Sequence, residues 1–433
     1  MSLQQWYLSF NFQSSGIGFD EWVSLFTLCL APVVVHLAIG VPEPTYLHDR
    51  PIKWHDRICH YNPTSILWRY FAIVDRRIRV RNWTALDMGA SNAIFWTTHG
   101  WDGSEAMMIE SRASCVRCPK NTRIKLLSQS AAKTLIITLQ GAQAAYTFIK
   151  GAKNLAELPM RLALDDIFAP IAVLGLYRLL ASLWLTDNYF YDREDYIGSD
   201  KSSTRSGMNR TLSALPPVPG TYAPPQPNMT IHFRHRNEWR GIVWRIIFLA
   251  FIASMLLMPV AFIIPLRSGQ FLTATLLFMN IFYVIFFTIT LFCTARCVFT
   301  KRSTSTVIPY ISHMWYKVYT CFIFIYMIFI VVIAALETRR TPCGEFTTFP
   351  VQIVVPDPPR DYDLKVCGGF KSFENATAGA FGMASRDFNM MGMQTISAFT
   401  GWCQGMMGSM TEALVVNGSS VTVMNVNQTL AKS

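Results

Sequence analysis

The sequence predicts an all-α integral membrane protein with about six transmembrane helices and an outer C-terminal tail that is poorly ordered or forms a small α+β unit. Two observations lead to this fold class. The first is composition: 51% of the 433 residues are hydrophobic, 15% are charged, and the mean hydropathy is +0.27, whereas a soluble domain usually carries roughly 25% charged residues. The second is a set of apolar runs of about 20 residues, which is the length that crosses the hydrocarbon core of a bilayer.

Five apolar runs are expected to cross the membrane as helices, because lipid offers no partner to backbone N–H and C=O groups and a helix satisfies them internally. In chain order they are 22–41, 167–185, 241–264, 271–292 and 318–336. The last three are dense in Ile, Leu, Phe and Val and are bounded by Arg or Lys. The first contains Pro32 and His36, and the second contains Pro170 and Arg178, yet both keep the length and apolarity of a span.

The stretch 126–149 is a weaker sixth span. It contains Gln129, Lys133, Gln140 and Gln143 among residues that are largely Ala, Gly, Ser, Leu and Ile. Small residues let helix backbones approach closely, so this stretch is expected to lie among other helices with little contact to lipid. The alternative is an amphipathic helix that lies on the membrane surface.

The basic residues of the connecting segments set the orientation through the positive-inside rule. Segment 1–21 has no Lys or Arg and is expected outside, whereas 42–125 has 13 and is expected in the cytosol. Alternation then places 186–240 in the cytosol and 337–433 outside. The cytosolic face is therefore basic and favours anionic lipid headgroups as partners; we expect no nucleic acid partner.

Two long cytosolic segments have different characters. Segment 42–125 mixes arginines with aromatic residues, which predicts a basic helix that is solvated on one face and packs against the bundle with the other. Segment 186–240 is rich in Ser and Pro, with six prolines between Pro216 and Pro227. Proline at this density favours polyproline II, which can bind an SH3 or WW domain; the alternative is a plain flexible linker.

The tail, 337–433, has features of an outer segment. It contains three glycosylation sequons, at Asn375, Asn417 and Asn427. Two of its three cysteines could pair in an oxidising lumen, most simply Cys343 with Cys367, which would leave Cys403 free or intermolecular. The Val-rich stretches Val351–Val355 and Ser420–Val426 suggest short strands. The sequons and cysteines favour a plasma or secretory-pathway membrane of a eukaryote.

Polar residues inside spans are functional candidates by default. Lys133 and Arg178 each lie seven residues from the cytosolic end of a predicted span, and no span contains Asp or Glu. An anionic substrate or a lipid phosphate would supply the missing counter-ion. The competing interpretation is that both side chains extend to the cytosolic interface. Asn280, in the fifth span, is expected to form hydrogen bonds between helices.

Metal chemistry has two weak candidates. Seven methionines lie between Met383 and Met410 and could bind Cu(I), although Met also fills cores and membrane-contacting helices. The pair Cys115 and Cys118 could form a zinc site with Cys59 and His60, but a single Cys-x-x-Cys more often marks free thiols or sites of acylation near the bilayer. We therefore predict no metal and no cofactor.

These patterns favour a non-enzymatic membrane protein that organises or senses through its tail and cytosolic segments. The sequence contains no Walker A loop, no dinucleotide fingerprint and no nucleophile elbow. A transporter or channel for an anionic or small polar solute is the first alternative, with Lys133, Arg178 and Asn280 along its pathway. A membrane enzyme that acts on lipid headgroups through His48 or His55 is the second.

Overall fold

The computed structural model describes most of the chain before residue 351 and the backbone of four strands after it. The described ranges are 7–14, 16–48, 51–125, 127–152, 162–192, 232–235, 237–263, 271–300, 304–341 and 344–350, followed by 381–388, 394–400, 412–417 and 420–425.

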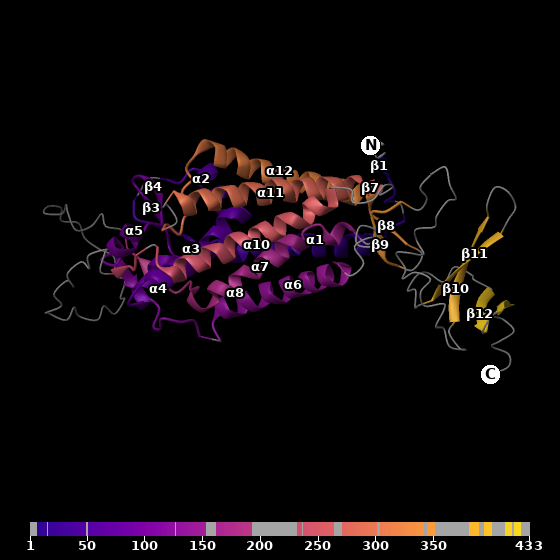
Figure 1. The fold of residues 1–433 in the computed structure, drawn as a ribbon, viewed down its shortest axis with the longest axis horizontal. Helices are drawn as coiled ribbons and strands as arrows, with labels where there is room; N and C mark the ends of the chain where they lie inside the picture. Colours follow the sequence, from indigo (N-terminus) through magenta and orange to yellow (C-terminus); the bar gives the residue numbers. More distant parts are fainter. Residues whose placement is uncertain are drawn as a thin grey trace, which may run out of the picture.

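The described chain is mostly helical, and five of its helical segments are long and apolar enough to cross a membrane. They are α1 (Phe19–Gly40), the segment Leu164–Trp184, α10 (Trp239–Ile263), α11 (Ala274–Phe299) and α12 (Met314–Glu337). Each overlaps one of the five apolar runs singled out in the sequence. They lie lengthwise beside one another in a single bundle (Figure 1), and this arrangement is compatible with the predicted all-α membrane protein.

The segment Leu164–Trp184 is not one continuous helix. It contains α7 (Ala169–Gly175) and α8 (Tyr177–Ala181), with a 3-10 turn at each end of the segment. Helix α6 (Gln129–Ala152) packs along it at very short range, because a Cβ atom on Gly141 would lie 2.7 Å from the carbonyl oxygen of Ala172. A Cβ on Gly175 would lie 2.6 Å from Ile137. Small residues thus bring the two helices together, but α6 is not among the five apolar spans, and a sixth span stays a prediction.

Helix α3 (Pro63–Arg79) is inserted among the spans. It begins at Asn62, whose side chain accepts a hydrogen bond from the Thr64 amide, and every residue from Pro63 to Arg76 is buried. Its first turn forms hydrogen bonds to the bundle: Thr64 Oγ1 lies 2.8 Å from Thr290 Oγ1 of α11, and Ser65 Oγ lies 2.7 Å from the Tyr316 hydroxyl of α12. The expectation of a helix solvated on one face is therefore wrong for α3, because the surrounding elements bury every side of it as far as Arg76.

An ion-pair network fixes the other end of α3. The carboxylate of Asp75 accepts two hydrogen bonds from Arg245 of α10, at 3.0 and 3.2 Å, and both side chains are almost fully buried. Arg79 pairs with Glu105, and Arg76 donates to two loop carbonyls. Since a buried charge without a partner is costly, this network determines which face of α3 meets α10.

The elements α2, α4, α5 and β2–β6, which we call the head, surround this end of the bundle. The helices are α2 (Trp54–Ile58), α4 (Ala85–Asn92) and α5 (Glu105–Glu110). Strands β2 (Pro44–Tyr46), β3 (Ile94–Thr97) and β4 (Gly100–Asp102) form one sheet, in which β2 is parallel and β4 antiparallel to β3. Strands β5 (Cys115–Arg117) and β6 (Phe190–Tyr191) form an antiparallel pair.

Short strands lie at the opposite end of the bundle, which we call the far end. The pairs are β1 (Tyr7–Ser9) with β7 (Phe271–Thr273) and β8 (Arg339–Arg340) with β9 (Phe346–Thr347). The buried carboxylate of Glu337, at the end of α12, accepts from the Ala274 and Thr275 amides. These amides belong to the first turn of α11, whose N–H groups have no partner within the helix. The side chain of Gln13 in turn donates to the carbonyl of Glu337.

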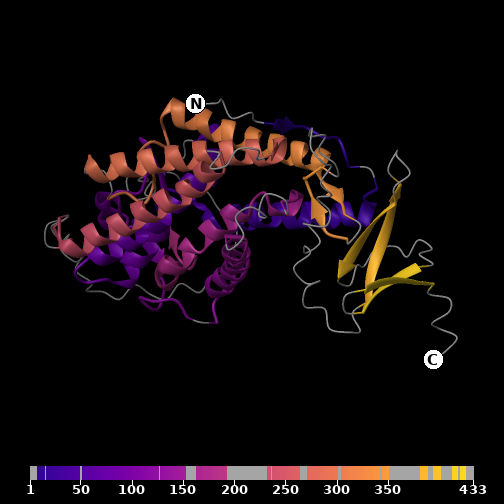
Figure 2. The ribbon, with the colours of Figure 1, turned by 45° about the vertical axis from the view of Figure 1, so that its right-hand side comes forward.

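The described part of the tail is a four-stranded antiparallel sheet. Its strands are β10 (Phe381–Phe388), β11 (Gln394–Thr400), β12 (Glu412–Asn417) and β13 (Ser420–Asn425), in the order β11-β10-β12-β13 (Figure 2). Strand β13 coincides with the predicted stretch Ser420–Val426, whereas Val351–Val355 lies outside the described residues.

The ion pair between α3 and α10 gives a stability prediction. We expect Asp75→Asn to lower the free energy of unfolding by roughly 3–5 kcal/mol, because the buried Arg245 would lose the carboxylate that balances its charge. Thermal unfolding of the purified protein in detergent would measure the loss. Glu110→Gln, at an exposed acid of the head, is the control, and we expect it to change stability by less than about 0.5 kcal/mol. Equal losses in the two variants would contradict this role for Asp75.

Candidate functional site

Arg178 of α8 is buried where α1, α3 and α6 meet. Its guanidinium donates to the carbonyl of Ile39 at 3.1 Å, to the Tyr70 hydroxyl at 3.2 Å and to Thr134 Oγ1 at 3.0 Å. Only 3% of the residue is exposed. Ile39 lies in the last turn of α1, where carbonyls lack partners within the helix and a positive side chain is favourable. Arg178 therefore connects three helices and closes the end of the first.

A second buried arginine acts on the same helix end. Arg69 of α3 donates to the carbonyl of Gly40 at 2.8 Å and to the carbonyl of Asn92 in the head at 3.0 Å. The last turn of α1 contains no basic residue of its own. Arg69 and Arg178, which lie far apart in the sequence, therefore supply the positive charge at this helix end. Both side chains form contacts within the protein.

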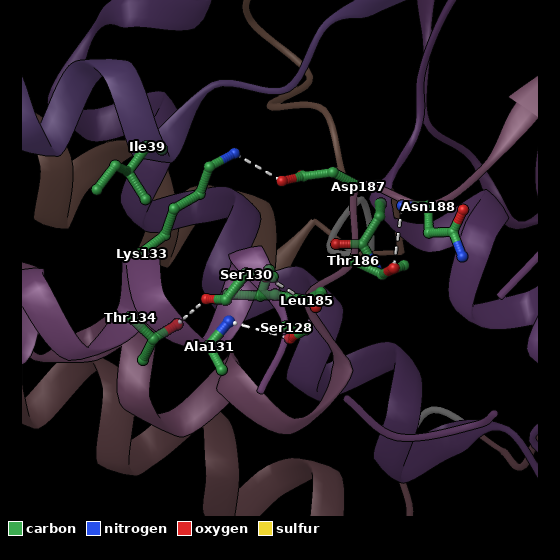
Figure 3. Close-up of polar contacts among 12 residues, drawn as sticks. Ile39, Ser128, Ser130, Ala131, Lys133, Thr134, Leu185, Thr186, Asp187 and Asn188 are labelled. Atoms are coloured by element: carbon green, nitrogen blue, oxygen red, sulfur yellow. Dashed lines mark hydrogen bonds and ion pairs between the residues drawn. The ribbon is translucent and has the colours of Figure 1, made fainter. Parts of the chain in front are cut away.

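Lys133 of α6 forms an ion pair with Asp187, which follows the segment Leu164–Trp184. The ammonium nitrogen lies 2.7 Å from Asp187 Oδ2, as Figure 3 shows. The same figure shows Ser130, whose hydroxyl donates to the carbonyl of Leu185 at 3.1 Å. The start of α6 is therefore tied to residues 185–187.

The structure brings two of the three predicted pathway residues close together. Arg178 bonds to Thr134, the neighbour of Lys133 in the chain, so both cations lie in one region at the head end of the bundle. Asn280 lies nearer the far end and donates to the Leu276 carbonyl of its own helix at 2.8 Å, where a bond between helices was expected. Lys133 has its counter-ion in Asp187, and Arg178 has three oxygen acceptors from the protein.

A pocket of about 390 Å³ opens beside the Lys133–Asp187 pair. It lies between the loop that follows β5 and the start of α6. Its basic lining residues are Arg117, Lys120, Arg123 and Lys125. Its remaining lining residues are Met88, Pro119, Asn121, Ile124, Ser128, Gln129, Ser130, Thr186, Asp187 and Asn188.

The loop that carries the four basic residues is held at several points. It begins in the β5–β6 pair, and its Ile124 amide donates to the carbonyl of Leu183 at 3.0 Å. At its end, Ser128 Oγ accepts from the Ala131 amide at 3.2 Å and caps α6 (Figure 3). The basic side chains are exposed, but the backbone that carries them has a defined path.

The electrostatic field of this region is strongly positive. Among the described residues that line the pocket, Asp187 is the one carboxylate, and Lys133 already neutralises it. Behind the loop, burial lowers the pKa of Arg77, and the positive charges of Arg123 and Arg234 lower that pKa further. An anion placed in the pocket would relieve this repulsion. The chemistry that the arrangement supports is therefore anion binding.

The chain has no recognised relative in the comparisons made. No family model, curated protein sequence or solved structure matches it.

A smaller cavity of about 60 Å³ lies on another side of the head, against His60. The His60 ring meets Trp101 edge-on with centroids 4.2 Å apart, and its Nε2 atom is buried without a hydrogen-bond partner. Burial, and secondarily the charge of Arg69, lowers the pKa of His60 to about 3. His60 is consequently neutral at physiological pH.

The four residues considered for zinc do not meet in one place. Cys59 is buried against the main bundle and donates to the His55 carbonyl, whereas Cys115 packs at the smaller core of the head. Over the described ranges, no group of three His, Cys, Asp or Glu side chains is placed to hold a metal ion.

His55 contacts Lys317 and Asp56, with Nδ1 3.1 Å from the Lys317 ammonium.

Several predicted sites fall outside the described residues. They are Cys343, Cys367, Asn375, Asn427 and the proline-rich stretch 216–227, together with most of the methionine-rich segment. Asn417 is the last residue of β12, and the structure describes only its backbone. The disulfide, glycosylation, SH3 or WW and copper hypotheses therefore stay predictions.

Sequence reasoning missed the pocket and the partners of the buried arginines. Four basic residues within 117–125, directly before a weak span, were a usable signal for the pocket. The sequence also placed Arg245 inside a span and Asp75 in a basic run, but nothing in their spacing linked them.

The contacts of the two intramembrane candidates predict different costs of substitution. We expect Arg178→Gln to lower the free energy of unfolding by about 3 kcal/mol, because buried acceptors at Ile39 and Thr134 would lose a charged donor. Lys133→Gln should cost less than about 1 kcal/mol, since the Lys133–Asp187 pair is partly exposed. Thermal unfolding in detergent would measure both. A larger loss for Lys133→Gln than for Arg178→Gln would refute this assignment.

The pKa of His60 predicts a pH dependence of stability. An unfolded chain binds a proton at this site near pH 6.5, whereas the folded protein does so only at about pH 3, so stability falls as pH drops below about 6.5. Through His60 alone we expect a loss of about 2 kcal/mol between pH 7 and pH 5. Denaturation of wild type and His60→Asn at both pH values would isolate this contribution; parallel profiles for the two proteins would show that His60 does not supply it.

Proposed function

We propose that this chain is a polytopic membrane protein that organises or senses at the membrane surface through its head, without a catalytic step of its own. The observation that carries the proposal is an inverted distribution of side chains along the spans. Buried positions include Arg178, Arg245, Asn280, Thr290 and Thr320. Many exposed positions of the same spans are Leu, Ile, Val or Phe, and Leu257 and Ile325 are each 67% exposed.

Such a surface is unfavourable in water, where contiguous apolar patches drive association. In lipid it is the expected surface, because hydrocarbon solvates Leu and Ile, while polar groups satisfy each other inside the bundle. The inverted distribution therefore supports insertion into a bilayer better than a soluble fold.

Exposed aromatic residues at both ends of the spans agree with this placement. Trp54, Trp239 and Trp315 are exposed at the head end, and Phe12 and Phe19 are exposed at the far end. Aromatic side chains gather at the two interfaces of a bilayer, where the ring meets the headgroup region. The basic head then faces the cytosol and the tail faces the outside of a plasma or secretory-pathway membrane.

The carrier hypothesis receives less support. It needs Lys133 and Arg178 to meet a solute in the bilayer, whereas the protein itself supplies oxygen partners to both. The lipid-enzyme hypothesis would use His55 as a base, but the Nδ1 atom of His55 already contacts Lys317 and Asp56, which form an ion pair with each other. The structured head favours a binding role.

The placement predicts a topology. We expect an epitope at the C-terminus to resist protease in sealed vesicles and the chain to remain in the membrane after alkaline carbonate extraction. Extraction into the soluble fraction would exclude integral insertion, and a protease-sensitive epitope would exclude an outer location of the C-terminus. Removal of sugars by a glycosidase, with Asn375→Gln, Asn417→Gln and Asn427→Gln as controls, would locate the tail independently.

If the chain does not transport solutes, it should not increase the release of anions from liposomes. Proteoliposomes that contain the purified chain should release trapped chloride or phosphate no faster than empty liposomes. Rapid release that disappears in the double variant Lys133→Gln and Arg178→Gln would overturn the proposal in favour of a carrier.

A further inference from the structure

We propose that the basic pocket at the start of α6 binds the phosphorylated headgroup of an anionic lipid. The inference rests on the proposed function, since it takes the head to lie at the membrane surface. It adds a specific site and a ligand class to the general attraction between a basic face and an acidic bilayer.

The charge of the pocket argues for a headgroup with more than one phosphate. Arg117, Lys120, Arg123 and Lys125 bring four positive charges to one cavity, and Asp187 is already neutralised by Lys133. A phosphodiester alone carries a single negative charge and would leave most of this charge unbalanced. A headgroup with phosphate monoesters carries several, and clusters of Lys and Arg near a bilayer recognise such lipids.

The pocket has the size and the backbone groups for this ligand. Its volume of about 390 Å³ lies in the range of small-ligand pockets, roughly 300–1,000 Å³. Ser128, Gln129 and Ser130 of the first turn of α6 also line it. The positive end of a 24-residue helix adds to the attraction for phosphate.

The surroundings of the pocket favour a lipid over a soluble phosphate. Leu183, whose carbonyl holds the loop at Ile124, is 49% exposed. Leu127, directly before the α6 cap, is fully exposed, and Ile136 lies exposed further along α6. An apolar surface therefore begins where the basic one ends. This is the pattern that a bound lipid requires, with phosphates among the cations and acyl chains along the helices.

The loop is already ordered without a ligand, which lowers the cost of binding. The β5–β6 pair fixes its start, the Ile124–Leu183 hydrogen bond its middle, and the Ser128 cap its end. A preorganised site loses less conformational entropy when the ligand arrives. The backbone positions that carry the four cations are then already set when the headgroup arrives.

The test is a binding measurement on the full-length chain in detergent micelles. The probe is a fluorescent short-chain phosphatidylinositol bisphosphate, with short-chain phosphatidylcholine as the neutral comparison. We expect the double variant Arg123→Gln and Lys125→Gln to weaken binding of the bisphosphate lipid roughly 30-fold, because each lost positive charge should reduce the affinity about fivefold. The matched control is Lys53→Gln with Arg57→Gln, which removes the same charge from exposed positions outside this pocket and should leave binding unchanged.

A gain-of-affinity variant keeps the test independent of folding defects. Asp187→Asn removes the one carboxylate of the pocket and frees Lys133, so binding should strengthen roughly fivefold. Equal losses in the pocket and control double variants would overturn the proposal, because general surface charge would then explain binding. No binding of the bisphosphate lipid by wild type would overturn it as well.

A competition experiment distinguishes a lipid headgroup from a soluble phosphate compound as the ligand. Inositol trisphosphate, which lacks acyl chains, should compete much more weakly than the lipid; equal affinity would overturn the lipid assignment and indicate a soluble ligand. Because the measurement uses micelles, its outcome is independent of whether the C-terminus is protected in vesicles. A failure of lipid binding is thus distinguishable from a failure of the proposed membrane placement.

Discussion

Burial of the charged groups of helix α3 is the constraint on which the rest of the structure depends. A guanidinium inside an apolar bundle needs acceptors on several sides, because an unpaired buried charge costs several kcal/mol. Arg69 finds them at the end of α1 and in α4, and Asp75 binds Arg245 of α10. Each contact joins the helix to a different part of the chain. The head must therefore lie directly against the spans, since its loops and the helix ends supply the oxygen atoms.

The same requirement places the basic pocket. Arg178 holds the end of α1 and the Thr134 side chain together, which fixes the start of α6 beside α8. Once that helix end is in place, the Ser128 cap and the Ile124–Leu183 hydrogen bond leave the preceding loop one path. The pocket thus depends on buried arginines that do not line it. The cations that hold the helices together are not the cations that line the pocket. The two groups differ more clearly in burial than in the residues that surround them in the sequence.

The sequence was sufficient to locate the apolar helices, but it was not sufficient to predict which residues contact one another between them. Runs of Ile, Leu, Phe and Val identify the apolar helices because hydrocarbon thickness and helix rise dictate their length. For 126–149, the small residues correctly indicated close contact with a neighbouring helix, but not whether it crosses. The expectation that this stretch lies among other helices is wrong for one of its sides, because Leu135, Leu139 and Ile149 are exposed. Helix α3 was missed as a buried element, because alternating Arg and aromatic residues are equally typical of a surface helix. Its burial depends on Arg245, which is 170 residues away from Asp75 and carries no local signal of the pairing. Asn280 illustrates the same limit, since a polar side chain in a span bonds within its helix or between helices according to rotamer.

The distance along the chain between Asp75 and Arg245 also bears on how the protein is made. Synthesis on the ribosome delivers α3, with its four arginines, well before α10 emerges. Until then Asp75 has only Arg79 of its own helix close by, and the face of α3 that packs against the later helices is uncovered. Burial of α3 must therefore wait for α10, and also for α11 and α12, which bond to its first turn, as is typical for chains whose contacts join distant segments. A chain that stops short of Arg245 would leave the carboxylate of Asp75 without its bidentate partner from α10.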